Sequence, residues 1–372
     1  MNRISIANPI FNGNEKKYLT ECIDTGWVSA NGRFIEEFQR RFAEFCGTKY
    51  ALACANGTVT LHLALIALGI GPGDEVIMPA LTYIATANAV RMCGATPVFV
   101  DSDPLTWNID PDEIEKAITP KTRAIIPVHL YGLACDMTRI MQVAKAHGIA
   151  VLEDAAEAHG AKWDGKTVGS IGDIGSFSFF GNKIITCGEG GMLVTNDEQM
   201  YETMKLYRSQ GVDLRQKRYW HVVSGYNYRM TNMQAAVGLG QLENVNWHLA
   251  QRRRVAETYN RLFARELEGY VTIQRVQQTE NHVYWMNSVV LTERVSKSRD
   301  LVMAEMEAQN IEMRPLFYPM HVMPPFFDDA KHFPVAEGLS ARGINLPSHA
   351  QMDDEKIEYV VKNLKKIIVG KE

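Results

Sequence analysis

The sequence predicts an α/β fold: a mainly parallel sheet with helices on both faces, followed by a smaller α+β C-terminal domain. Short β-branched runs alternate with helical patterns from about residue 74 to 196, which is typical of a parallel sheet covered by helices. After residue 231 a long helical pattern begins, and shorter mixed elements follow it. The 372 residues suffice for one large and one smaller domain, since single cores stop growing at roughly 250–300 residues.

The elements expected in the sheet domain follow from these patterns. The strands are expected at Glu75–Met78, Pro97–Val100, Ala124–Val128, Ala150–Leu152, Ser176–Phe179 and Met192–Thr195. The helices between them are expected at Thr82–Met92, Asp112–Ile118 and Met137–His147. Gly94 and Gly148 lie where a C-terminal cap is favoured, and Pro111 lies where a first helical turn tolerates proline. Because strand–helix–strand crossovers are right-handed, the sheet is expected to be open and twisted.

The second part of the chain begins with apolar residues at helical spacing after Thr231, which predict one long helix or two in succession. We expect the domain boundary inside this helical region, giving a large domain over residues 1–245 and a smaller one over 246–372. The elements expected in the smaller domain are strands at Val283–Leu291 and Ile311–Arg314, a helix at Ser298–Gln309 and a closing helix from Asp353.

Composition excludes several classes of function. With 39 Lys+Arg against 43 Asp+Glu, the net charge is −4, which provides no broad basic surface for nucleic acid. The longest apolar run, Leu61–Ile70, is about half of what a bilayer crossing needs. Residues Met1–Ile10 lack the pattern of a signal peptide. We therefore expect a cytoplasmic protein without membrane association.

The six cysteines are scattered and contain no CxxC pair. In a reducing compartment such residues are most often buried apolar side chains. We expect no disulfide framework and no metal site.

Acidic residues follow directly after the expected strand that ends at Leu152. Asp154, Glu157 and His159 are expected at the carboxyl edge of the sheet, where open α/β folds bind their ligands. These side chains match no named metal motif. A carboxylate at this edge can bind a protonated ring nitrogen, ligate a metal or cap a helix, and the segment alone leaves these possibilities open.

Lys183 lies between apolar aromatic residues and the glycine-rich turn Gly188–Gly191, just past the end of a strand. Poor solvation there favours the neutral amine, which can condense with an aldehyde. A lysine in a surface turn is the plainer alternative. A P-loop is excluded because Asn182 precedes the lysine and Ile184 follows it.

A third segment, Cys54–Leu63, places small and polar residues before a helix. Their backbone amides and the hydroxyl of Thr58 or Thr60 can bind a phosphate at the positive end of that helix. A simple N-terminal cap would have the same residues.

Taken together, these segments resemble the nucleotide-sugar aminotransferases of the DegT/DnrJ/EryC1/StrS family, which are pyridoxal 5′-phosphate (PLP) enzymes of fold type I. The resemblance runs from Ile4 to the last helix in the family's order. The segments that carry it are Asn56–Thr58, Pro79–Thr86, Glu153–Ala156, Ser176–Lys183, Gly188–Gly191 and Gly225–Met230. Gly32–Ile35, Phe179–Lys183, Arg218–Trp220 and Pro319–Pro325 are most similar to the branch of the family that acts on a GDP-linked sugar.

The resemblance assigns the cofactor site. It implies that Lys183 bonds covalently to the cofactor aldehyde and later moves a proton as an acid/base. Asp154 matches the carboxylate that pairs with the pyridine nitrogen and lets the ring accept electrons. Ser178, with the backbone of Gly57 and Thr58, matches the phosphate site.

Three further positions follow from the same resemblance. Tyr83 matches the aromatic residue stacked on the cofactor ring, where core packing is the plainer role. Asn227 matches a residue that reaches the phosphate of the neighbouring subunit, which implies a homodimer with composite sites. Glu157 stands where a glutamine is commoner in the family, beside the ring oxygen. A carboxyl group there is expected to be protonated or to share a proton, because two adjacent anions repel.

The implied reaction moves an amino group from L-glutamate, through pyridoxamine phosphate, to C4 of a nucleotide-linked 4-keto-6-deoxy sugar. Arg229, Arg218 and Arg314 are candidates for binding the diphosphate. His321 is a candidate for lining the sugar pocket. Each of the four can instead be a surface ion-pair partner or a packed loop residue.

Two other functions compete with transamination. A PLP-dependent sugar dehydratase of the same fold carries histidine in place of Lys183, and a sugar-binding regulator would retain the fold without chemistry. The joint presence of Lys183, Asp154 and Ser178 argues against both.

Overall fold

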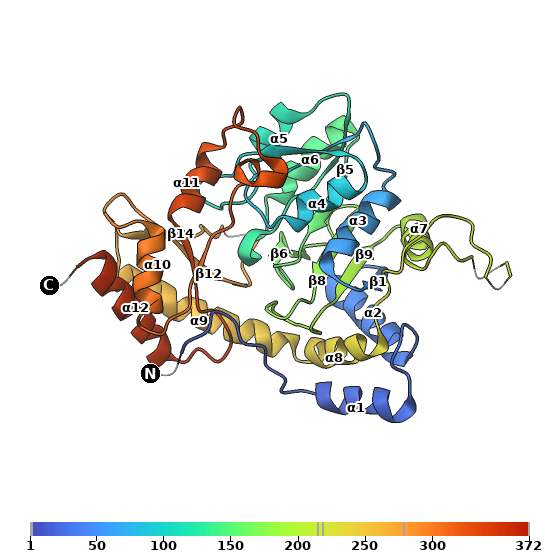
Figure 1. The fold of residues 1–372 in the computed structure, drawn as a ribbon, viewed down its shortest axis with the longest axis horizontal. Helices are drawn as coiled ribbons and strands as arrows, with labels where there is room; N and C mark the ends of the chain where they lie inside the picture. The colour runs from blue at the N-terminus through green and yellow to red at the C-terminus, as the bar shows by residue number, and fades with distance from the viewer. Residues whose placement is uncertain (1–2, 214–215, 218, 278–279, 371–372) are drawn as a thin grey trace.

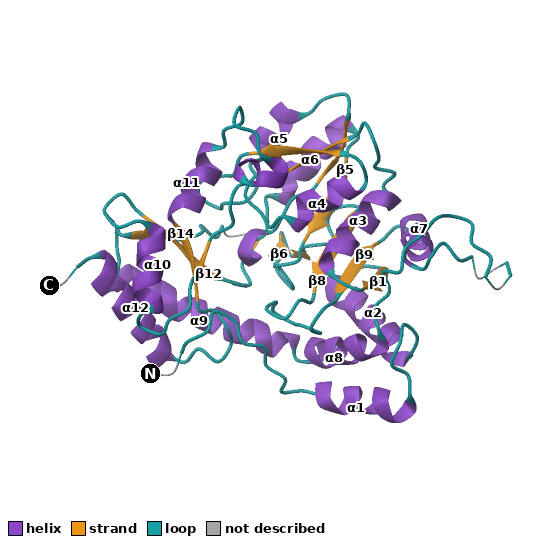
Figure 2. Ribbon diagram, in the orientation of Figure 1, coloured by secondary structure: helices purple, strands orange, loops and turns teal. Residues whose placement is uncertain are grey.

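The computed structural model describes residues 3–213, 216–217, 219–277 and 280–370 (Figure 1). A seven-stranded sheet lies at its centre, with the strand order β1-β9-β8-β5-β4-β2-β3. These strands are β1 (Tyr50–Cys54), β2 (Glu75–Pro79), β3 (Thr96–Val100), β4 (Thr122–Ile125), β5 (Ala150–Asp154), β8 (Ile174–Ser178) and β9 (Gly191–Thr195). The sheet lies among helices on both sides (Figure 2).

The sheet is mainly parallel, as the sequence predicted. The pairs β2–β3, β2–β4, β4–β5 and β5–β8 are parallel. Strand β9 is antiparallel to both β8 and β1, so it alone among these seven runs in the opposite direction. Since β5 and β8 are parallel and Asp154 pairs with Ser176, both strands deliver their last residues to one edge.

Alternate residues of the strands enter two different cores. Val151 belongs to the same apolar cluster as the aromatic side chains of α2, whereas Leu152 belongs to the cluster that contains the apolar residues of α3. Successive side chains of a strand point to opposite faces, so both faces of this sheet require a covering layer of helices. Those helices are α2 (Arg33–Cys46), α3 (Gly57–Ala67), α4 (Ala85–Met92), α5 (Pro111–Ala117), α6 (Met137–His147) and α7 (Glu198–Arg208).

Local signals in the sequence set several helix ends. Pro111 occupies the first turn of α5, and Gly148 ends α6 with a φ of 65°, a left-handed conformation that glycine adopts without strain. Thr231 and Gln234 form a capping box at the start of α8 (Asn232–Glu243). These ends match the sequence-based predictions for α5 and α6 to within a residue.

The helical region after Thr231 consists of two helices in succession. Helix α8 ends before Asn244, and α9 (Val245–Glu266) continues from the large sheet toward the C-terminal elements (Figure 1). Helix α1 (Glu15–Thr25) packs against α8.

A second sheet of four antiparallel strands has the order β10-β12-β14-β13. Its strands are β10 (Val271–Thr272), β12 (Asn287–Leu291), β13 (Arg314–Pro315) and β14 (Gly343–Leu346). The helices of this part of the chain are α10 (Arg299–Glu307), α11 (Pro334–Arg342) and α12 (Asp354–Ile368). Residues of β12, β14, α9, α10 and α12 form a separate apolar cluster, which Ile4 and Ile311 join. A domain boundary near residue 245 stays a prediction.

Three remaining short strands form a small sheet with the order β11-β6-β7. They are β6 (Lys162–Trp163), β7 (Lys166–Thr167) and β11 (Glu280–Asn281). Three single-turn 3₁₀ helices complete the elements: η1 (Leu130–Gly132), η2 (Met320–Val322) and η3 (Pro324–Phe326).

Several sequence-based expectations differ from the structure. The strand expected at Ala124–Val128 stops at Ile125, and the helix expected from Thr82 begins at Ala85. The strand expected at Ile311–Arg314 begins at Arg314. Strands β1 and β14 and helix α11 were not predicted.

Candidate active site

Four residues that the sequence analysis assigned to the cofactor site lie together at the carboxyl edge of the seven-stranded sheet. Asp154 is the last residue of β5 and Ser178 the last of β8, while Gly57 begins α3. Lys183 follows β8 in a turn, in which its amide donates to the carbonyl of Phe180 at 3.0 Å. All four line one cavity of 640 Å³. Ligand sites of open α/β sheets are found at this edge.

Lys183 is almost buried in the wall of this cavity, with 12% of its side chain exposed. Its Nζ lies 3.9 Å from Oε1 of Glu157 and 4.0 Å from the ring centroid of Trp285. Burial lowers the pKa of the Lys183 ammonium, and the charges of Glu157 and Asp154 oppose this shift. A larger fraction of neutral amine is therefore present than for an exposed lysine.

Asp154 lies buried at the end of β5. Its Oδ2 accepts a hydrogen bond of 2.8 Å from Oγ1 of Thr86, and its Oδ1 accepts one of 3.2 Å from the amide of Ala156. Burial raises the pKa of Asp154, while these two donors and the charge of Lys183 act against the rise. A buried carboxylate with few donors is suited to pair with a protonated ring nitrogen.

Glu157 faces Lys183 from the turn after β5. Its Oε2 accepts a hydrogen bond of 2.8 Å from the amide of Tyr131. Burial raises the pKa of Glu157 to about 7, and the charge of Lys183 limits the rise. A carboxyl group with this pKa exchanges its proton near neutral pH.

A small concave surface for an anion lies at the start of α3. The side chain of Asn56 caps the helix by accepting from the amide of Val59 at 3.0 Å. A Cβ on Gly57 would lie 2.7 Å from Cβ of Ser178, so only glycine allows this close approach. The positive end of α3 and the Ser178 hydroxyl thus lie together, as phosphate binding requires. Thr58 lines the same cavity.

Tyr83 also lines the cavity, and 59% of it is exposed. Its ring centroid lies 5.8 Å from that of Phe317. This exposure does not fit the alternative of core packing, and it leaves a ring face free for a planar ligand.

The candidate substrate residues are more scattered. Arg314 lines the cavity and forms an ion pair of 3.2 Å with Glu312. His321 does not line it: the ring is buried, its Nε2 lies 3.0 Å from Oε1 of Glu337, and it packs on Phe333.

Two other predicted residues, Asn227 and Arg229, do not line the cavity. Asn227 is exposed, and its Oδ1 accepts a hydrogen bond of 3.4 Å from Nε of Arg229. Arg218 lies outside the described residues.

Sequence reasoning did not single out several residues that line the site, namely Thr86, Trp285, Phe317 and Asn345. Tyr131, which binds Glu157, adopts a φ of 56°. Thr86 lies within Pro79–Thr86, a segment that carries the resemblance, so the sequence offered a reason to include it among the site residues. The others come from the C-terminal part of the chain or from an irregular turn, where periodicity carries no information about the site.

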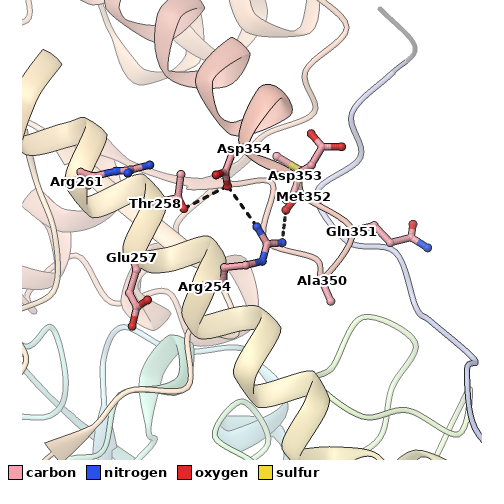
Figure 3. A pocket seen from close by; sticks show the side chains of 9 residues that line it. All are labelled: Arg254, Glu257, Thr258, Arg261, Ala350, Gln351, Met352, Asp353 and Asp354. Carbon is pink, nitrogen blue, oxygen red and sulfur yellow. Dashed lines mark hydrogen bonds and ion pairs between the residues drawn. The ribbon is translucent and has the colours of Figure 1, made fainter.

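A second hollow, of 710 Å³, lies between α9 and the start of α12 (Figure 3). Arg254 spans it and donates to the carbonyl of Met352 at 2.5 Å and to Oδ1 of Asp354 at 3.4 Å. Thr258 also approaches Asp354 (Figure 3). Arg254 and Thr258 thus bind the start of α12, and Lys183, Asp154 and Ser178 belong to the other cavity.

Two negative findings concern the described residues only. No group of three or more His, Cys, Asp or Glu side chains there is arranged to hold a metal ion. No helix within the described ranges is long and apolar enough to cross a membrane.

The fold and this donor set define a PLP-dependent aminotransferase of fold type I: a buried lysine, a carboxylate for the ring nitrogen and an anion site lie around one cavity. The family model of the DegT/DnrJ/EryC1/StrS aminotransferases matches residues 9–365, and the chain belongs to this family.

Individual relatives agree with this assignment. A protein of Caulobacter vibrioides named GDP-perosamine synthase is 54% identical over 99% of both chains. One of the same name from Escherichia coli O157:H7 is 45% identical over 98% of both. The solved structure of DesV from S. venezuelae in complex with a ketimine intermediate covers 98% of both chains, at 31% identity and a TM-score of 0.91.

Proposed function

We propose that this protein moves the amino group of L-glutamate to C4 of GDP-4-keto-6-deoxy-D-mannose and so forms GDP-perosamine, a precursor of the O-antigen of lipopolysaccharide. The observation that carries the proposal is the buried amine of Lys183, with Glu157 at 3.9 Å and Asp154 in the same cavity. The full-length similarity to two proteins named GDP-perosamine synthase supports the choice of sugar.

PLP supplies an aldehyde for the amine and a ring that accepts electrons from the substrate carbon. The chain's own residues do the rest. Asp154 holds the ring nitrogen in its protonated form, and the start of α3 with Ser178 binds the phosphate. Lys183, once its amine is free, carries the proton between the reacting carbons as a general acid/base. Glu157 takes up or releases a proton beside it.

The rival functions lack support from the site. A sugar dehydratase of this fold would carry histidine in place of Lys183. A regulator without chemistry would have no need for Lys183, Asp154 and Ser178 to converge on one cavity. An aminotransferase for a UDP- or dTDP-linked keto sugar is the closest alternative, because it differs only in the nucleotide.

We further propose a homodimer with composite active sites. Asn227 is exposed and does not line the cavity of its own chain, which supports a role for it in the partner's site. Mixed dimers of Lys183→Ala and Asn227→Ala chains test this. They are expected to regain activity that neither variant shows alone, because each hybrid contains one intact composite site. Hybrids without activity contradict the proposal.

The six free cysteines support a reducing compartment, so we propose the cytoplasm as the place of action.

The reaction is tested with purified protein. It is expected to be yellow, to lose its colour with L-glutamate, and to retain the cofactor on Lys183 after borohydride reduction. Incubation with glutamate and a panel of GDP-, UDP- and dTDP-linked 4-keto sugars then identifies the substrate. Amination of the GDP-linked sugar is expected. Preference for another nucleotide overturns the GDP assignment. The absence of any amino sugar overturns the proposal that the protein aminates a nucleotide-linked 4-keto sugar.

A further inference from the structure

Trp285 covers the amine of Lys183 from a distant part of the chain. It precedes β12, whereas Lys183 follows β8. The indole is 5% exposed and lines the site cavity, and its ring centroid lies 4.0 Å from Nζ of Lys183. A cation at this distance over an indole face is stabilised by the ring quadrupole, most strongly when water is excluded.

The same side chain also holds the backbone next to Lys183. Nε1 of Trp285 donates a hydrogen bond of 2.9 Å to the carbonyl oxygen of Asn182, the residue before the lysine. One indole therefore fixes both the turn that carries Lys183 and the end of its side chain.

Trp285 is itself held from behind. Nη1 of the buried Arg252 donates to the carbonyl oxygen of Trp285 at 2.6 Å. The indole stacks on Tyr131, with ring centroids 6.2 Å apart and an interplanar angle of 19°. A Cβ on Gly132 would lie 3.0 Å from the amide nitrogen of Trp285, so this segment packs tightly on the turn that carries Tyr131. These contacts fix the position of the ring.

A long ion pair to Glu157 accompanies the contact with Trp285. Three titratable groups act on Lys183 or are acted on by it: Glu157, Asp154 and His159. Nζ stays 3.9 Å from Oε1 of Glu157, which is beyond hydrogen-bond distance. The carboxylate attracts the ammonium through its charge and the indole through its ring quadrupole, and together they hold Nζ at the cavity wall.

We propose that Trp285 is a positioning residue for Lys183: its ring face holds Nζ at the cavity wall whenever the amine is not bonded to the cofactor, and its N–H fixes the preceding turn. The cofactor chemistry rests on the proposed function, whereas the contact of the ring with Lys183 can be tested separately in the cofactor-free protein.

The ring face is tested in the cofactor-free protein by placing tryptophans with one, two and three fluorine atoms at position 285. Fluorine weakens the ring quadrupole and nearly preserves the shape and the N–H group. The pKa of Lys183 is measured by competitive acylation across pH, followed by mass spectrometry of its peptide. It is expected to fall stepwise, by roughly one unit in total.

The matched control is the same fluorinated series at Trp247, which lies on α9 outside the residues that line the site. There the pKa of Lys183 is expected to stay constant. A constant pKa across the series at Trp285 overturns the role of the ring face. Because no substrate is used, this result is independent of whether the protein aminates a GDP-linked sugar.

The N–H group is tested by replacing Trp285 with its benzothiophene analogue, which keeps the ring and lacks the donor. The rate constant for capture of PLP by the cofactor-free protein is expected to fall several-fold, measured by absorbance, while the pKa of Lys183 is retained. Trp285→Phe, available by ordinary mutagenesis, is expected to slow capture at least as much. An unchanged capture rate in both chains overturns the positioning role of the N–H.

Discussion

Lys183 and Glu157 face each other across 3.9 Å inside the active-site cavity. Burial acts on the pKa values of the two groups in opposite directions: it lowers that of the lysine and raises that of the glutamic acid to about 7. Burial therefore favours the neutral forms of both groups, while their mutual attraction favours the charged pair. This balance makes the protonation state of the site sensitive to pH near neutrality.

The first prediction concerns stability as a function of pH. Since the pKa of Glu157 is about 7 in the folded chain against an ordinary value of 4.5, its stabilising contribution is complete below pH 4.5. It is lost between pH 4.5 and 7, a difference of about 3 kcal/mol. Glu157→Gln cannot ionise, so this variant does not lose that contribution. As the pH rises across this window, its free energy of unfolding is expected to increase relative to that of the wild type. Urea denaturation of the cofactor-free protein measures the difference.

The control for this measurement repeats the pair of proteins in a Lys183→Ala background. Without the lysine, Glu157 loses an attraction that lowers its pKa, so the pH window is expected to extend upward. If the stability curves of the chains with and without Glu157→Gln ran parallel at all pH values in both backgrounds, the carboxyl group would not be buried as described.

The second prediction concerns Thr86, whose Oγ1 donates to Oδ2 of Asp154 at 2.8 Å. Thr86→Val removes a hydrogen bond to a charged group, worth about 1.5–3 kcal/mol. The pKa of Asp154 is expected to rise further, because this donor lowers it. In a plot of kcat against pH, the acid limb is then expected to move to higher pH. In a binding titration, PLP is expected to bind roughly tenfold more weakly.

Thr82→Val is the matched control for Thr86→Val. Thr82 lines the same cavity, and its buried Oγ1 has no hydrogen-bond partner within the described ranges. Thr82→Val changes the side chain in the same way but removes no hydrogen bond to a described residue. It is therefore expected to leave the PLP affinity and the acid limb of the kcat profile unchanged. Equal effects of the two substitutions would indicate a response to packing and not to the lost hydrogen bond.

How far the sequence predicts this site depends on the kind of signal. Asp154 was predictable because it follows an apolar strand, and the ends of parallel strands meet at one edge. Ser178 was assigned through the resemblance to the family. Helix α6 was predicted with its observed bounds, since a periodic apolar face is followed by Gly148. Periodicity does not encode strand direction, which is why the reversed strand β9 was not foreseen.

The parts that were missed depend on tertiary contacts. Trp285 lies far from Lys183 in sequence, and nothing in its own segment indicates which residue its ring covers. Tyr131 takes a left-handed conformation that is rare for aromatic residues, and its amide then binds Glu157. For His321 the sequence left a place in the sugar pocket and a packed loop position open, and in the structure its ring is buried against Phe333.

The third prediction concerns Asp154, the buried carboxylate that we propose binds the ring nitrogen of the cofactor. Asp154→Asn keeps the size of the side chain and removes the charge that holds a pyridinium proton. The loss of one partner from a buried charge pair costs about 3 kcal/mol, or roughly a hundredfold in kcat. Some PLP is expected to bind, with a changed absorption spectrum. A kcat within a factor of about two of the wild type would contradict the role of Asp154.

The fourth prediction concerns the reactive amine itself. Lys183→Ala removes the group that reacts with the cofactor aldehyde and the base that moves the proton, so steady-state turnover is expected to disappear. The fold is expected to remain, because Lys183 makes one ion pair and one ring contact at a cavity wall and is not part of either core. Steady-state kinetics measures the turnover, and circular dichroism and cofactor binding by dialysis measure whether the fold remains.

Lys183→Arg, which keeps a cation over Trp285 but cannot condense with an aldehyde, separates charge from reactivity. It is expected to be inactive and to yield no borohydride-stable adduct, and turnover in either variant would mean that another group is the nucleophile.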